Sequence, residues 1–299
     1  MKQRRRVFGA VAVAALLTVS ATAAAQVSEL DAHRARARSA PMDAQAGLVL
    51  GRALIRAGKS AEAVLELRRV ATLPAAKKGP TAIAVKYEIA RAAMAHKEMH
   101  RAVQACRQVS LVPGGVAMGH ACAAEAYLTQ RRASEALFEA EKAQASGEVL
   151  YEAKLAEGLA QEMALDEGEA EQALREAVRL APERAEGHVA LGRFLVSQGK
   201  RDEGLAALRK GLELDRTSPE ALYELGRVLP AGPEALALLE RATQEKERYG
   251  AALEALAVQA LASNRLGQAR GAAEAALALD GNQVGARLVL GPVARAEGK

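Results

Sequence analysis

The sequence is poor in residues that build β-sheets and stack on nucleobases. It contains no tryptophan, and Phe and Tyr together make up 3% of its 299 residues. β-branched residues are sparse, and no segment shows the alternation of apolar and polar residues that is typical of a strand. So few aromatic side chains offer little surface for base stacking. Ala, Leu, Glu and Arg dominate instead, and this composition predicts an all-α protein.

Signatures of enzymes are also missing. We find no G-x-S-x-G motif, no phosphate-binding glycine loop, no dinucleotide fingerprint and no clustered Cys/His set. His96 and His100 have the i, i+4 spacing of two zinc ligands, but no glutamate stands directly after His96, and the pair lies across the expected turn between two helices. We therefore predict no enzymatic activity, no cofactor and no metal site. An enzyme with an unrecognised site is the alternative, which a stoichiometric copurifying metal or cofactor would support.

The one long apolar run lies at the N-terminus. Basic residues between Lys2 and Arg6 precede an apolar stretch that ends at Leu17, and small residues follow up to Ala25. This order predicts a secretory signal peptide, residues 1–25, so we expect the mature chain to be periplasmic or secreted. The alternative is an uncleaved segment that tethers an assembly factor to the membrane, for which the run is short.

Charge gives no indication of a nucleic-acid partner. The four basic residues of the predicted signal peptide account for all but one unit of the net charge of +5. Arg34, Arg36 and Arg38 form the remaining basic cluster, which is typical of a solvated helix face. We therefore predict no nucleic-acid binding, and contact with a membrane only if the signal segment is retained.

Small residues recur with a period of 34. Within residues 151–184, small residues fill the eighth, twentieth and twenty-seventh places, a leucine the twenty-fourth and a proline the thirty-second: Gly158, Ala170, Ala177, Leu174 and Pro182. The same places 34 residues later hold Gly192, Gly204, Gly211 and Leu208. This pattern resembles the tetratricopeptide-repeat family, whose units are helix-turn-helix hairpins. The resemblance implies an all-α solenoid, a right-handed superhelix in which neighbouring units share one core.

The repeat frame covers nearly all of the sequence after an N-terminal segment, residues 26–43. We predict a solenoid over 44–299, with one unit preceded by a five-residue insertion and another lacking three residues near its internal turn. The units are 44–77, 83–116, 117–150, 151–184, 185–218, 219–249 and 250–283, followed by a half unit, 284–299. No unit has the tryptophan that is common in the family.

The two cysteines occupy neighbouring units. Cys106 falls in the second helix of one unit and Cys122 in the first helix of the next, so antiparallel packing brings them to a similar height. A disulfide is one interpretation, because exported proteins form them. The other is a pair of buried thiols that act as small core residues.

The resemblance implies a scaffold that holds a peptide or partner protein in its concave groove, in envelope assembly or secretion. In the family, the fifth and ninth residues of each first helix point into that groove. Four units here place an apolar or aromatic residue and an arginine there: Leu48 and Arg52, Tyr87 and Arg91, Val189 and Arg193, Tyr223 and Arg227. Arginine pairs with carboxylates, so we expect a ligand with acidic and apolar residues. Ordinary solvated arginines are the alternative. If the arginines do bind the ligand, replacing Arg91 and Arg227 with Glu removes binding without lowering thermal stability.

Overall fold

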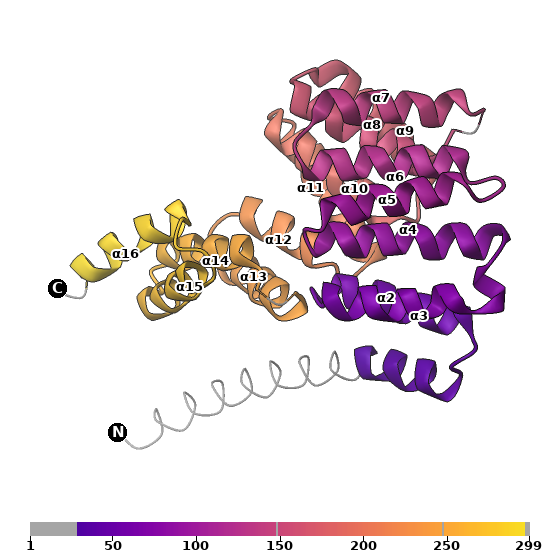
Figure 1. The fold of residues 1–299 in the computed structure, drawn as a ribbon. Helices are drawn as coiled ribbons and strands as arrows, with labels where there is room; N and C mark the ends of the chain where they lie inside the picture. The colour runs from indigo at the N-terminus through magenta and orange to yellow at the C-terminus, as the bar shows by residue number, and fades with distance from the viewer. Residues whose placement is uncertain (1–28, 148, 247, 297–299) are drawn as a thin grey trace.

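A computed structural model describes residues 29–147, 149–246 and 248–296 (Figure 1). The predicted signal peptide, residues 1–25, lies outside these ranges. The described chain is helical and has no strand, and a helix at 29–39 precedes α2. The helices that follow form successive hairpins: α2 (Ala44–Arg56) with α3 (Ser60–Thr72), α4 (Gly79–Ala95) with α5 (Met99–Ser110), α6 (Val116–Thr129) with α7 (Ala133–Ala145), α8 (Tyr151–Ala164) with α9 (Glu167–Leu180), α10 (Ala185–Ser197) with α11 (Arg201–Leu214), α12 (Pro219–Val228) with α13 (Pro233–Glu245), α14 (Gly250–Ala262) with α15 (Leu266–Leu279), and then α16 (Val284–Ala296).

Close contact between a glycine and a leucine holds several hairpins together. The position that a Cβ on Gly192 would take lies 2.8 Å from the Gly204 carbonyl oxygen and 2.8 Å from the side chain of Leu208. Gly51 faces Leu67 and Gly158 faces Leu174 in the same way. These leucines are fully buried, and each one fills the space that a side chain on the facing glycine would occupy.

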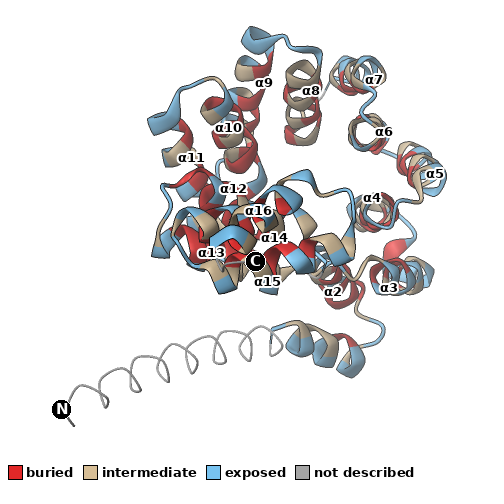
Figure 2. Cartoon of the chain, turned by 90° about the vertical axis from the view of Figure 1, so that its left-hand side faces the viewer, coloured by how far each residue is buried: buried red, intermediate tan, exposed pale blue. Residues whose placement is uncertain are grey.

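The hairpins stack into a curved array with the first helix of each on the inside. α2, α4 and α6 pack successively against one another, as do α8, α10 and α12. Figure 2 shows α3, α5 and α7 outside this inner row. The hairpins from α12 onward extend away from the stack formed by α2 to α11 (Figure 1). No helix in the described ranges is both long and apolar enough to cross a membrane.

The hairpin that lacks three residues has a short first helix. α12 ends at Val228, which leaves carbonyl groups at its C-terminal end without helical partners. The buried Gln259 side chain, from α14, donates to the carbonyl oxygens of Gly226 and Leu229 at 3.2 and 3.1 Å. Arg201 donates to the carbonyl oxygen of Val228. The neighbouring hairpins therefore supply the bonds that the missing turn would have made.

The structure departs from the repeat frame at one insertion. α4 begins at Gly79, four residues before the predicted unit start at residue 83. Pro80 lies in its first turn, where the missing N–H has no helical bond to lose. The inserted residues therefore lengthen the helix at its N-terminal end.

Cys106 and Cys122 are joined by a disulfide between α5 and α6. Their Cα atoms lie 5.4 Å apart and both side chains are fully buried. The bridge links two successive hairpins at a point where the core otherwise consists largely of alanine, methionine and partly buried side chains. It closes a loop of 16 residues, for which the chain-entropy model gives a stabilisation of about 3 kcal/mol.

Gly192→Ala is expected to destabilise the protein by about 1–3 kcal/mol, because the new methyl group would overlap Gly204 and Leu208. Gly271→Ala is the matched control in α15, where a Cβ would meet nothing within 4 Å. There the change should stabilise by about 0.5–1 kcal/mol, because alanine favours the helix. Urea denaturation measures both. Equal effects of the two changes would show that helix propensity, not close packing, governs these positions.

Gln259→Leu should lower the free energy of unfolding by about 1–3 kcal/mol, because the carbonyl groups of Gly226 and Leu229 at the end of α12 would lose their donor. Gln108→Leu, at an exposed position of α5, is the control and should change stability by less than about 0.5 kcal/mol. Thermal and urea denaturation give the comparison. An unchanged Gln259→Leu protein would mean that water satisfies the α12 carbonyls.

Candidate functional site

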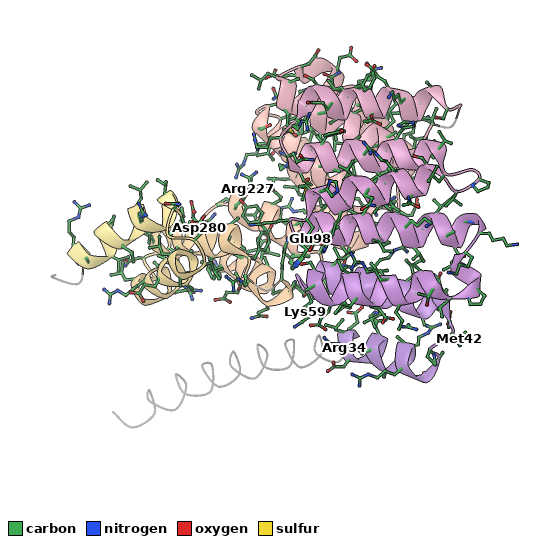
Figure 3. All side chains as sticks on the ribbon, viewed as in Figure 1. Arg34, Met42, Lys59, Glu98, Arg227 and Asp280 are labelled. Carbon is green, nitrogen blue, oxygen red and sulfur yellow. A yellow bond between two sulfur atoms is a disulfide. The ribbon has the colours of Figure 1, made fainter. Side chains whose placement is uncertain are left out.

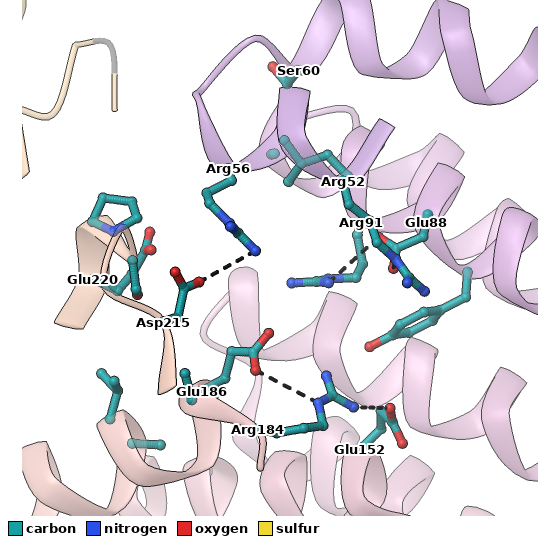
Figure 4. A pocket seen from close by; sticks show the side chains of 18 of the residues that line it. Arg52, Arg56, Ser60, Glu88, Arg91, Glu152, Arg184, Glu186, Asp215 and Glu220 are labelled. Carbon is teal, nitrogen blue, oxygen red and sulfur yellow. Dashed lines mark hydrogen bonds and ion pairs between the residues drawn. The ribbon is translucent and has the colours of Figure 1, made fainter. Parts of the chain in front are cut away.

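The inner face of the array encloses a cavity of about 1390 Å³ (Figure 4). Residues from the first helices α2, α4, α6, α8, α10 and α12 line it, together with the turn that follows α13. Its wall combines aliphatic side chains such as Ile55, Ile83 and Met118 with charged side chains of both signs. A space of this size, formed by many helices, can hold a peptide segment or a large ligand.

The cavity contains five of the eight predicted groove residues. Arg52, Tyr87, Arg91, Val189 and Arg193 line it. Tyr223 and Arg227 instead line a separate pocket of about 290 Å³ against α14. These predicted groove residues therefore lie in two separate pockets, because the array changes direction at the short α12.

Leu48 was predicted to contact a partner, but it belongs to the hydrophobic core. Its side chain is 3% exposed and packs in the cluster that contains Leu54 and Leu67. Val189 is 8% exposed, so it presents only an edge to the cavity and packs mainly with Leu208 and its neighbours. At Leu48 and Val189, the fifth position of the first helix is covered by adjoining helices and contributes to the hydrophobic core.

The arginines that line the cavity already have carboxylate partners. Arg52 donates from Nε to Glu88 at 2.7 Å, and the Glu88 side chain is 2% exposed. Arg91 lies 3.6 Å from Glu88 and 3.5 Å from Glu125. The guanidinium groups therefore join α2, α4 and α6 along the inner face, rather than standing free for a ligand.

The other two arginines are paired in the same way. Arg193 makes two hydrogen bonds to Glu162, at 2.7 and 2.5 Å, a bidentate arrangement between α10 and α8. Arg227 donates to Glu224 in its own helix at 2.6 Å. Each of the four predicted arginines thus has a carboxylate partner within the chain, and its contact with a ligand stays a prediction.

The glutamates were missed at the sequence level, although a signal for them exists. The segment Y-E-I-A-R, residues 87–91, recurs as Y-E-L-G-R at 223–227. Glutamate and arginine three residues apart share one helix face, so the motif predicts an ion pair. In both copies the guanidinium also lies over the tyrosine ring, 5.9 and 5.8 Å from its centre.

Tyr87 links the second and third hairpins through its hydroxyl. It donates to Glu125 at 2.9 Å. Burial, together with the negative charge of Glu125, raises the pKa of Tyr87 well above its ordinary value, so the phenol stays protonated and remains a donor. The tyrosine is therefore a fixed part of the wall.

The opposite wall carries a second charged cluster. Arg184 pairs with Glu152 at 2.5 Å and with Glu186 at 3.7 Å, and its guanidinium lies 4.0 Å from the centre of the Tyr151 ring. Figure 4 shows Arg91 pointing from α4 toward this cluster. Burial lowers the pKa of Arg91, but the negative charge of Glu125, with smaller effects of Glu88 and Glu186, outweighs it and raises this pKa, so Arg91 stays charged.

Two cations in the lining make no ion pair with a side chain in the described ranges. Lys97 follows α4 and Arg248 follows α13, and both are exposed. Each lies in a tight turn with positive φ, 62° and 57°. These two exposed cations therefore differ from Arg91 and Arg193, which are paired with carboxylates of the chain.

The two histidines at i, i+4 spacing lie on either side of a helical turn. α4 ends at Ala95, α5 begins at Met99, and the His96 ring contacts the Ser60 hydroxyl at 3.3 Å. Across the described ranges, no group of three or more His, Cys, Asp or Glu side chains is arranged to hold a metal ion.

Within the basic cluster of Arg34, Arg36 and Arg38, the Arg34 guanidinium pairs with the Glu62 carboxylate at 2.8 Å.

Solved structures of tetratricopeptide-repeat proteins share this architecture. An APC/C Cut9–Hcn1 structure matches 90% of this chain and 52% of the matched chain, with a TM-score of 0.63 and 13% identity. PilW, a type IV pilus biogenesis factor, matches 61% of this chain and 86% of its own, with a TM-score of 0.54 and 22% identity. The match to yeast Tom70 covers 92% of this chain and 59% of the Tom70 chain, with a TM-score of 0.53 and 14% identity.

The chain therefore has the tetratricopeptide-repeat solenoid fold, as its 34-residue period predicted. It spans about half the length of the Cut9–Hcn1 match. No protein-family model matches the sequence, and no curated protein shows significant similarity to it.

Arg91→Glu is expected to lower the free energy of unfolding by about 1–3 kcal/mol, because it would place a third carboxylate beside Glu88 and Glu125. This replaces the expectation of unchanged stability. Arg248→Glu makes the same charge change at an exposed cavity position and should leave the thermal midpoint nearly unaltered. Differential scanning calorimetry compares them. Equal midpoints would mean that the Arg91 network does not hold the helices together.

Proposed function

We propose that this protein is an exported, non-enzymatic scaffold that binds a segment of a partner protein in the cavity. The observation that carries the proposal is the cavity itself, about 1390 Å³ formed by the inner faces of six successive hairpins. Most of its charged wall residues are held by their own ion pairs, so much of the surface is organised before a ligand arrives. A preorganised surface loses less conformational entropy on binding.

The lining favours a segment that combines apolar residues with both signs of charge. Ile55, Ile83, Met118 and Leu159 supply apolar contacts. Lys97 and Arg248 can receive carboxylates, whereas Glu186, which is exposed and only loosely paired, can receive a basic group. The proposed ligand is therefore less acidic than the four arginines alone would have suggested.

Export rests on the predicted signal peptide, which precedes the described residues, and agrees with the disulfide between Cys106 and Cys122. A role in envelope assembly or secretion follows as part of the proposal, and the likeness in fold to PilW, a pilus biogenesis factor, supports it. An N-terminus at Gln26 in the native protein, found by intact mass measurement, would support cleavage, and a retained leader would favour the tethered alternative.

Photo-crosslinking from within the cavity tests the binding role. A diazirine analogue of lysine at Lys97 should form crosslinks to a discrete partner when the protein is irradiated in its native host. The same analogue at Lys210, on the outer helix α11, is the matched control. Peptide mass spectrometry then maps the crosslinked segment of the partner.

The proposal predicts crosslinks at position 97 that are absent at position 210. Crosslinks of equal yield and identity from both positions would indicate nonspecific neighbours. Absence of any crosslink from position 97, with the protein present at its native level, would contradict binding in the cavity.

A further inference from the structure

Two distant parts of the chain meet at the rim of the cavity. The Arg56 guanidinium, at the end of α2, lies 3.4 Å from the carboxylate of Asp215, in the turn between α11 and α12 (Figure 4). Most other ion pairs of the inner face join residues in the same or adjacent hairpins. This pair instead joins the first hairpin to the linker before the sixth, and so closes one turn of the superhelix.

Helix packing contributes little to this closure. α2 packs closely on α3 and α4, and it has no extensive packing with α11, α12 or α13. By contrast, extensive helix packing joins each hairpin to the next. At the rim, as far as the described residues show, polar side chains rather than a shared hydrophobic core bring the two edges together.

Such a contact is weak and sensitive to salt. The side chains of Arg56 and Asp215 are 49% and 23% exposed, so water and ions screen their attraction. Exposed ion pairs contribute at most about 1 kcal/mol, equivalent to about a fivefold change in an equilibrium. The edges at the rim can therefore separate and rejoin without unfolding any hairpin.

We propose that the Arg56–Asp215 contact is a salt-sensitive clasp that opens the superhelix to admit a ligand to the cavity. The clasp concerns access to the proposed binding site and so rests on the proposed function, although opening itself needs no ligand. Both residues line the cavity, so a charged segment that enters can compete for either partner. Ligand binding and rim opening are then coupled through the same two side chains.

The distance across the rim tests the clasp directly. Nitroxide labels on Ala61→Cys in α3 and Arg216→Cys beside Asp215 report it by double electron–electron resonance, and both positions are exposed. The native cysteines are bridged and do not take up the label. At low ionic strength we expect one narrow distance distribution. Asp215→Arg, or high salt, should raise the open-to-closed ratio by up to about fivefold.

Charge reversal provides the specific control. Arg56→Asp combined with Asp215→Arg should restore the narrow distribution, because the pair is rebuilt in the opposite sense. Asp202→Arg, at an exposed position of α11, makes the same change in charge away from the rim and should have no effect.

A distance distribution that changes neither with Asp215→Arg nor with salt would overturn the clasp. So would a double variant, Arg56→Asp with Asp215→Arg, that does not restore the narrow distribution. These outcomes leave binding in the cavity intact, because they are measured without ligand. Conversely, a clasp that opens as expected in a protein that forms no crosslink from position 97 would refute the binding role alone.

Discussion

The close approach of two helices within each hairpin is the constraint on which the structure depends. A glycine of the first helix, such as Gly158, Gly192 or Gly226, receives the buried leucine of the second. In other hairpins buried alanines of the two helices pack in one cluster, such as Ala124 with Ala140. Because the interhelical distance is set repeatedly by these small residues, successive hairpins stack with similar geometry. Their small angular offsets accumulate into a superhelix.

The closed cavity is a consequence of that accumulation. After five hairpins, the turn that holds Asp215 returns to the level of Arg56. The inner face is then held by ion pairs between successive first helices, which leave few charges free. The short α12, capped by Gln259, stands where the remaining hairpins leave the ring. The loss of three residues in one hairpin thus changes the direction of the array and places Tyr223 and Arg227 outside the cavity.

The fold was predictable from the sequence because its signal is repeated. A period of 34 residues, with small residues at fixed places, appears several times, so individual departures do not obscure it. The site was less predictable. Leu48 was assigned to the groove by position alone, whereas its burial depends on the helices on either side. The partners of Arg52 and Arg193 lie 36 and 31 residues away, and their pairing depends on how hairpins are rotated. Among the predicted arginines, Arg227 and Arg91 have a partner three residues away that a motif can indicate, Glu224 and Glu88.

The central claim is that one turn of this solenoid closes around a cavity. Small-angle X-ray scattering of residues 26–299 at low ionic strength tests it most directly, because an extended solenoid and a closed turn differ strongly in their distance distributions. The account predicts a distribution with the compact maximum of the ring formed by α2 to α11 and a tail from the hairpins beyond α12. A broad distribution typical of an elongated, open superhelix would contradict it.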